Sequence, residues 1–157
     1  MMSEREDRMA RCFRDLIVYH KAREVNRLIF EMSKSFPKDE TYSLIDQVRR
    51  SSRSIGAQIA EAWGKRRYER HFMSKLTDAD AEQMETQHWL ETAVDSGYLE
   101  ERQAEKMFDM LREIGKMLNS MIVKADSFCR SDAHPLREKS TGHFTETDSD
   151  TPKSGRT

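Results

Sequence analysis

Four segments of the chain repeat apolar residues at alternating spacings of three and four positions. This spacing gathers the apolar side chains on one face of an α-helix, because the helix turns once every 3.6 residues or so. The expected helices cover residues 13–34, residues 39 or 40 to 64, residues 69–96 and residues 100–128. The sequence contains no run of alternating apolar and polar residues that would indicate a half-buried strand. It therefore predicts an all-α protein.

The connections between these segments are only a few residues long. Phe36-Pro37 ends the first helix, since the residue before a proline is driven out of the helical conformation. Gly97 is well placed to cap the third helix. Helices joined by such short connections pack as antiparallel neighbours. We therefore expect an up-and-down antiparallel four-helix bundle.

The bundle is expected to span residues 13–129. Residues 1–12 are highly charged and are expected to form a frayed extension. Residues 130–157 are rich in Ser, Thr, Asp and Lys and contain little apolar surface. Such a segment cannot offset the entropy lost on ordering, so a disordered C-terminal tail is expected.

Composition restricts the class of protein further. The chain has no apolar run near the roughly 20 residues that cross a bilayer, and its first residues lack the apolar stretch of a secretory signal. A cytoplasmic protein without a membrane partner is therefore expected. Its two cysteines, Cys12 and Cys129, have no metal-ligand spacing and are expected to be free thiols.

Sequence signals of catalysis are weak. A carboxylate-bridged metal site in a helical bundle needs two Glu-x-x-His motifs, and the one match here is Glu85-Thr86-Gln87-His88. Neither a Gly-x-Ser-x-Gly elbow nor a glycine-rich phosphate loop is present. We therefore expect no catalytic residue, metal or cofactor. The alternatives are a catalytic pair formed by Glu61 and Glu85 and a metal-dependent bundle enzyme.

Charge is distributed unevenly along the chain. Residues 38–75 carry nine Lys or Arg and five Asp or Glu, a net charge of +4, whereas residues 76–127 carry five and twelve, a net charge of −7. The candidate nucleic-acid-binding residues in the basic part are Arg49, Arg50, Arg53, Lys65, Arg66, Arg67 and Arg70. Trp63 and Tyr68 interleave with the second group. Such rings can stack on unpaired bases, and the alternative is that both are core or seam residues. The alternative is that the arginines pair with the acidic helices, within a subunit or across an interface.

The second expected helix has an unusual back face. Its core face carries Leu44, Val48, Ile55 and Ile59, but the opposite face carries the small residues Ala57, Ala60 and Gly64. A solvated face usually carries longer polar side chains, so we expect another helix surface to pack there. Glu61 and Glu85 are expected near helix–helix seams, where each needs a positively charged partner, Arg50 or Arg53 of the same or of another subunit. The candidate oligomer interface is therefore Ala57, Ala60, Glu61 and Gly64.

These residues together form a recognisable pattern. The chain resembles the four-helix-bundle proteins encoded in intervening sequences of bacterial 23S rRNA genes, also called S23 ribosomal proteins. It is also similar to their relatives, the accessory variability determinant proteins of diversity-generating retroelements. The resemblance rests on residues 13–16, 21–22, 36–40, 47–55, 58–61, 65–67, 72, 85–86 and 97–99.

The resemblance implies a homopentamer with a central channel and no established enzymatic activity. It also implies association with a reverse transcriptase and binding of nucleic acid through basic surfaces. The resulting hypothesis is a non-enzymatic oligomeric accessory protein that binds RNA or DNA. The alternative is a protein-interaction scaffold whose arginines stabilise the oligomer.

Overall fold

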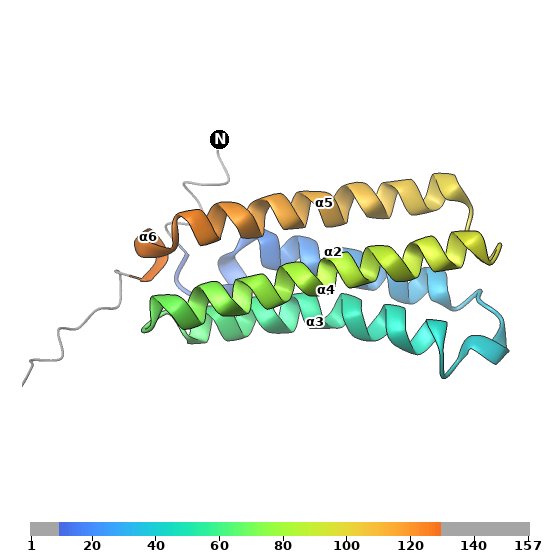
Figure 1. Ribbon diagram of the computed structural model, residues 1–157, viewed down its shortest axis with the longest axis horizontal. Helices are drawn as coiled ribbons and strands as arrows, with labels where there is room; N and C mark the ends of the chain where they lie inside the picture. The colour runs from blue at the N-terminus through green and yellow to red at the C-terminus, as the bar shows by residue number, and fades with distance from the viewer. Residues whose placement is uncertain (1–9, 130–157) are drawn as a thin grey trace, which may run out of the picture.

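The fold is a bundle of four long antiparallel helices (Figure 1). The computed structural model describes residues 10–129. Its elements are η1 (Phe13–Asp15), α2 (Ile17–Ser33), η2 (Lys38–Glu40), α3 (Leu44–Gly64), α4 (Glu69–Asp95), α5 (Glu101–Val123) and α6 (Ala125–Cys129). Residues 10–129 contain no strand, so the predicted all-α bundle is confirmed. The predicted disordered tail, and most of the predicted N-terminal extension, lie outside the described residues.

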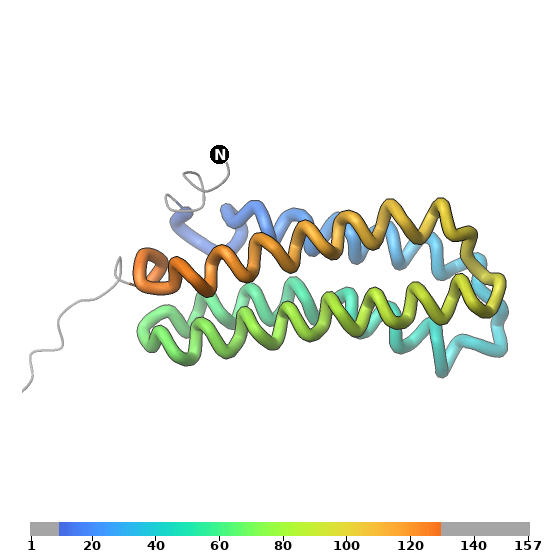
Figure 2. Tube along the Cα trace, turned by 45° about the horizontal axis from the view of Figure 1, so that its top comes forward, coloured from blue at the N-terminus to red at the C-terminus, as the bar shows by residue number. Residues whose placement is uncertain are grey.

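The helices are arranged so that each has two neighbours. α2 lies beside α3 and α5, and α4 lies beside α3 and α5 (Figure 2). Each of the four helices turns its apolar seam to the common interior. The side chains there are fully buried and include Val25, Ile29, Val48, Ile55, Leu76, Leu90, Leu111 and Ile114. Each such side chain contributes about 1.5–3 kcal/mol through removal of apolar surface from water.

Two helices begin later than the sequence suggests. Leu16 has an extended backbone (φ −69°, ψ 128°), so α2 starts at Ile17 and not at Phe13. The Asp15 carboxylate accepts the backbone N–H groups of Arg11 and Cys12 at 2.9 and 3.2 Å, which holds this start as a separate turn. Likewise α3 begins at Leu44, because η2 occupies residues 38–40.

The end of α5 also differs from the expectation. The predicted fourth helix ran to Phe128, but α5 stops at Val123, and the short α6 turns away after Lys124. Phe128 remains buried because it stacks on Phe72 of α4, with ring centroids 5.9 Å apart. The chain thus closes this end of the bundle with an aromatic pair.

Gly97 ends α4 as predicted. Its φ of +75° is the left-handed conformation that favours glycine. The N–H of Tyr98 donates to the carbonyl of Ala93, and the N–H of Gly97 donates to that of Val94, both at 2.9 Å. This pair of bonds is the Schellman motif, which satisfies the last carbonyls of a helix.

The two loops at this end of the bundle are tied together by Glu40. Its carboxylate accepts a hydrogen bond from the Tyr98 hydroxyl at 3.1 Å and from the backbone N–H of Leu44 at 3.2 Å, and the Ser43 hydroxyl also donates to it. The rings of Phe36 and Tyr98 pack beside this contact, 5.8 Å apart. These bonds, that of Ser43 first, lower the pKa of Glu40 below its ordinary value of 4.5.

We predict that Gly97→Ala destabilises the fold by about 1–2 kcal/mol, since an added Cβ disfavours the left-handed conformation. A Cβ at Gly97 meets no atom within 4 Å, so the penalty is conformational alone. Gly64 is the matched control: its Cβ would also meet nothing within 4 Å, and its φ is not left-handed. Gly64→Ala should stabilise by about 0.4–1 kcal/mol. Urea denaturation measures both changes.

We predict that the Glu40 contacts make stability depend on pH below 4.5. Because the pKa of Glu40 is lowered by folding, its contribution is fully present above the unfolded pKa and is lost as the pH falls through the folded pKa. Glu40→Gln should therefore unfold at a lower temperature than the wild type at pH 7. The difference should shrink in acid. A difference in melting temperature that is the same at both pH values would contradict this assignment.

Candidate nucleic-acid interface

Four basic residues surround the turn between α3 and α4, and we call Lys65, Arg66, Arg67 and Arg70 the turn cluster. The last residue of α3 is Gly64, and α4 begins at Glu69. The side chains of this short turn therefore lie at one end of the bundle. Lys65, Arg67 and Arg70 are exposed, and Arg66 is half-buried.

Arg66 is fixed in place by Trp63. Its Nε donates to the carbonyl of Trp63 at 3.1 Å, and its guanidinium lies 3.5 Å from the centre of the indole ring. Trp63 is half-buried against the core. The sequence left open whether this ring is a seam residue or a stacking platform. The structure places it at the seam, with the guanidinium over the ring.

Tyr68 presents the exposed aromatic ring of this end. The residue is 58% exposed, and its ring centroid lies 5.4 Å from that of His71. Arg67 and Arg70 on either side make no hydrogen bond or ion pair within residues 10–129. The turn thus combines available cations with an available ring, as single-strand binding surfaces do.

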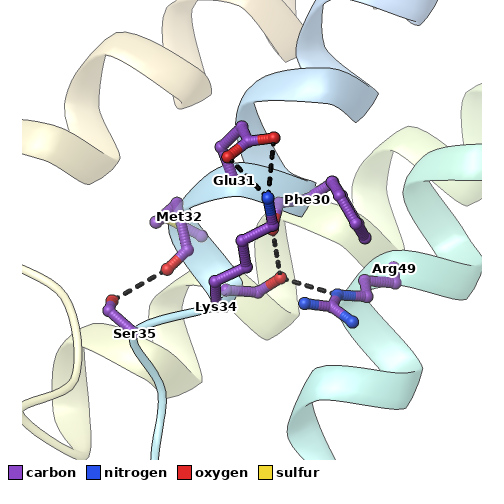
Figure 3. A network of polar contacts seen from close by, with 7 residues as sticks. Phe30, Glu31, Met32, Lys34, Ser35 and Arg49 are labelled. Atoms are coloured by element: carbon purple, nitrogen blue, oxygen red, sulfur yellow. Dashed lines mark hydrogen bonds and ion pairs between the residues drawn. The ribbon is translucent and has the colours of Figure 1, made fainter.

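The other predicted arginines lie in different environments. The Nε of Arg49 donates to the Ser33 hydroxyl at 2.7 Å, and Ser33 donates to the carbonyl of Phe30 at 3.0 Å (Figure 3). The guanidinium of Arg49 also lies 4.7 Å from the Phe30 ring centre. Arg49 therefore joins α3 to α2. The alternative that it pairs with the acidic helices of its own subunit is wrong.

Arg50 lies toward α4, where it acts on the half-buried Glu82. The pKa of Glu82 is raised mainly by burial and also by Glu85, whereas the charge of Arg50 lowers it. Arg50 itself is exposed. Arg53 is exposed as well and faces α2, with its guanidinium 5.9 Å from the Phe30 ring. Arg49 and Arg53 therefore lie together beside the Phe30 ring of α2, and Arg50 lies apart from them, toward α4.

Glu61 pairs with Lys75 of α4 and not with Arg50 or Arg53 of the same subunit. The two charged atoms are 2.9 Å apart. The Lys75 hydrogen bond lowers the pKa of Glu61 and raises that of Lys75. Glu85 has a different partner, since its carboxylate accepts the indole N–H of Trp89 at 3.1 Å. Both carboxylates are exposed, and Glu61 lies beside the seam of α3 and α4, across which it reaches Lys75.

The small-residue face of α3 is open. Ala57 and Gly64 are exposed, and Ala60 is half-buried. A groove of about 500 Å³ lies over this face, between α3 on one side and η1 with α2 on the other. Arg14, Arg23 and Arg53 line it. The sequence reading did not single out Arg14 and Arg23, because η1 and α2 approach α3 only in the folded bundle.

Metal ligands do not converge in the part of the chain that is described. Within residues 10–129, no three side chains of His, Cys, Asp or Glu are grouped as a metal site. His88 is exposed and packs edge-on against Trp89. Cys12 and Cys129 are free thiols. None of the helices in residues 10–129 has the length and apolar character needed to cross a membrane.

Comparison with known proteins identifies the family. The sequence model of the 23S rRNA-intervening sequence proteins matches residues 14–120, most of the bundle. The chain belongs to this family. It is also similar to the crystal structure of an S23 ribosomal protein family member from Bacteroides thetaiotaomicron VPI-5482. The identity is 30% and the TM-score is 0.61, over 68% of this chain and 98% of that one.

That S23 family protein is described as having unknown function, and its family name indicates no catalytic activity. No curated protein matches the chain significantly. The predicted family is therefore confirmed, whereas its relation to retroelement proteins stays a prediction. The residues that carry the resemblance now have structural roles, since Glu40 and Tyr98 join two loops and Arg49 joins two helices.

We predict that Arg49→Ala destabilises the bundle by about 1–3 kcal/mol. The change removes a hydrogen bond from a charged donor and a cation–π contact. Arg50→Ala is the matched control, because Arg50 is exposed and its loss should change stability by no more than about 0.5 kcal/mol. Thermal denaturation of both variants measures the difference. Equal effects would mean that the Ser33 and Phe30 contacts contribute nothing.

Proposed function

We propose that this protein is a non-enzymatic, cytoplasmic member of its family that binds RNA or DNA through the turn cluster. The observation that carries the proposal is the grouping of Lys65, Arg67 and Arg70 around the exposed ring of Tyr68. Phosphate binding by such cations supplies most of the affinity of sequence-independent complexes. Stacking of unpaired bases on an aromatic ring adds about 1–3 kcal/mol per base.

Local charge favours this end of the bundle over the rest of the surface. Glu69 is the single carboxylate between Lys65 and Arg70, and Glu61 is already paired with Lys75. On α5, in contrast, Arg112 is paired with both Glu105 and Asp109, at 2.7 and 2.6 Å. Within the described residues, a polyanion therefore meets cations without an ion pair at Arg67 and Arg70, whereas it meets a compensated cation at Arg112.

We predict that Arg67→Glu/Arg70→Glu abolishes binding of a fluorescein-labelled oligo(U) or oligo(dT) in fluorescence anisotropy. The wild type should bind with an affinity that falls steeply as salt rises, since each phosphate contact releases counterions. Arg66 is a poorer choice because it also holds Trp63. The matched control is Arg102→Glu/Lys106→Glu on α5, which makes the same charge change at the opposite end of the bundle.

The result that contradicts the proposal is equal binding by the turn variant and the α5 control. Light scattering reads the oligomeric state of the same samples. If the turn variant loses its oligomer, the scaffold alternative is favoured, because the cations then stabilise subunit contacts.

The second candidate is a homo-oligomeric scaffold, and the open face of α3 favours it. Ala57 and Gly64 are exposed small residues, over which another helix backbone could come close. In this second candidate the subunits associate through Ala57, Ala60, Glu61 and Gly64. The oligomer is then the pentamer that the resemblance implies. Glu61 would then act together with its Lys75 partner. A reverse transcriptase is the protein partner that the resemblance implies for either candidate.

A further inference from the structure

The groove between α2 and α3 has a charge of one sign. Arg14 from η1, Arg23 from α2 and Arg53 from α3 line it, and no lining residue is acidic. Within residues 10–129 none of these three arginines forms an ion pair. Three separate elements thus bring uncompensated guanidinium groups to one depression of the surface.

The arginines at the groove are supported by neighbouring rings. The guanidinium of Arg14 lies 4.4 Å from the ring centre of Phe13, and that of Arg23 lies 5.9 Å from that of Tyr19. Phe13 and Tyr19 pack edge to face, with centroids 5.0 Å apart. Such contacts restrict where a flexible side chain can place its charge. The cations are therefore partly organised before anything binds.

The floor of the groove is kept low by small residues. Gly56, Ala57 and Ala60 lie there on α3. The half-buried Asn26 supplies an amide beside them, and its oxygen accepts the buried Ser52 hydroxyl at 3.4 Å. Polar groups next to arginines can donate hydrogen bonds to phosphate oxygens as well. A long side chain at position 57 would fill this space.

The groove leads directly to the turn cluster. Arg53, Ala57, Ala60 and Gly64 follow one another at spacings of four, three and four, so they share one face of α3. Gly64 is the last residue before the turn. At 1.5 Å per residue the distance from Arg53 to Gly64 is about 16 Å along the helix axis. The turn between α3 and α4 lies at the same end of the bundle as η1 (Figure 1).

We propose that this groove holds the phosphate backbone of a single nucleic-acid strand that continues from the turn cluster. The inference rests on the proposed function and adds the form of the nucleic acid, which is single-stranded. The axes of packed helices lie about 8–10 Å apart, and a duplex is wider than its own major groove, which alone is about 12 Å across. A duplex therefore cannot enter the groove, but one strand can lie along it.

Phosphates suit this groove better than the carboxylates of an acidic helix. The guanidinium fork binds phosphate through two parallel hydrogen bonds, and three such groups line this one groove. Glu61, the carboxylate on α3 nearest this line, is held away by Lys75 at 2.9 Å. An acidic protein helix is the competing occupant, and the experiment below distinguishes it.

The test measures oligo(dT) and oligo(U) binding by anisotropy over a salt series, with Arg23→Gln/Arg53→Gln as the groove variant. Loss of two phosphate contacts should reduce the steepness of log affinity against log salt by about 1.4, since each contact contributes about 0.7 for single strands. Arg102→Gln/Lys106→Gln, with the same charge change on α5, should leave the slope unchanged. A blunt-ended duplex should be insensitive to the groove variant.

A second variant closes the groove without changing its charge. Ala57 is exposed, so Ala57→Trp should fold, and circular dichroism checks this. We expect about a tenfold loss of single-strand affinity with the turn cluster intact, and no loss for Ala57→Ser. Light scattering establishes whether the oligomeric state changes.

The outcomes separate the two proposals. Single-strand binding that needs Arg67 and Arg70 but ignores both groove variants overturns the groove assignment and keeps the proposed function. Absence of wild-type binding overturns both. Loss of the oligomer in Ala57→Trp, or groove variants that weaken binding of a synthetic glutamate-rich helical peptide but not of oligo(dT), assigns the groove to a protein and overturns the proposal.

Discussion

The packing of α3 between α2 and α4 is the constraint on which the other features depend. One face of α3 is buried completely, with Val48, Ile55 and Ile59 in the core. This face can approach α4 closely because its polar members are short. The hydroxyls of Ser51 and Thr86 are buried and hydrogen-bonded to each other at 2.9 Å. A buried hydroxyl without such a partner would cost about 1–3 kcal/mol.

Its neighbour Ser52 performs the same task toward α2, through its hydroxyl contact with Asn26. The serines between the arginines therefore join helices, and they show no sign of a nucleophile. With two sides of α3 committed to α2 and α4, its remaining side faces outward. That remaining side carries small residues with arginines beside them, and it is the side of α3 on which a partner can pack.

The sequence predicted the fold well because its information is periodic and local. The apolar spacing predicted the core face of all four helices. The glycine at position 97 predicted the cap of α4, whose hydrogen bonds lie within the six residues 93–98. The starts of α2 and α3 were placed too early, since Asp15 and Glu40 each accept backbone N–H groups and close a separate turn. Periodicity alone cannot reveal such side-chain bonds.

The candidate surface was less predictable, because its pairings connect separate helices. Arg49, Arg50 and Arg53 are close in sequence, but Arg50 lies toward Glu82 of α4, whereas Arg49 and Arg53 lie toward Phe30 of α2. Glu61 lies nearer in sequence to Arg53 than to Lys75, yet the bundle places Lys75 within 2.9 Å. Two side chains on a helix are certain to be neighbours only when they lie three or four residues apart, about one turn. Which charges remain uncompensated is therefore a property of the assembled bundle.

This distinction explains why residue charge alone is a poor guide to a binding surface in so highly charged a chain. Arg112 and Arg67 are equal in charge, but two carboxylates surround Arg112 and none pairs with Arg67 within residues 10–129. Binding a phosphate at Arg112 would first require those carboxylates to be displaced, whereas at Arg67 it requires only the loss of water and counterions. The proposed binding of a polyanion therefore rests on arginines without a carboxylate partner in the described part of the chain, Arg67 and Arg70 at the turn and Arg14, Arg23 and Arg53 along the groove.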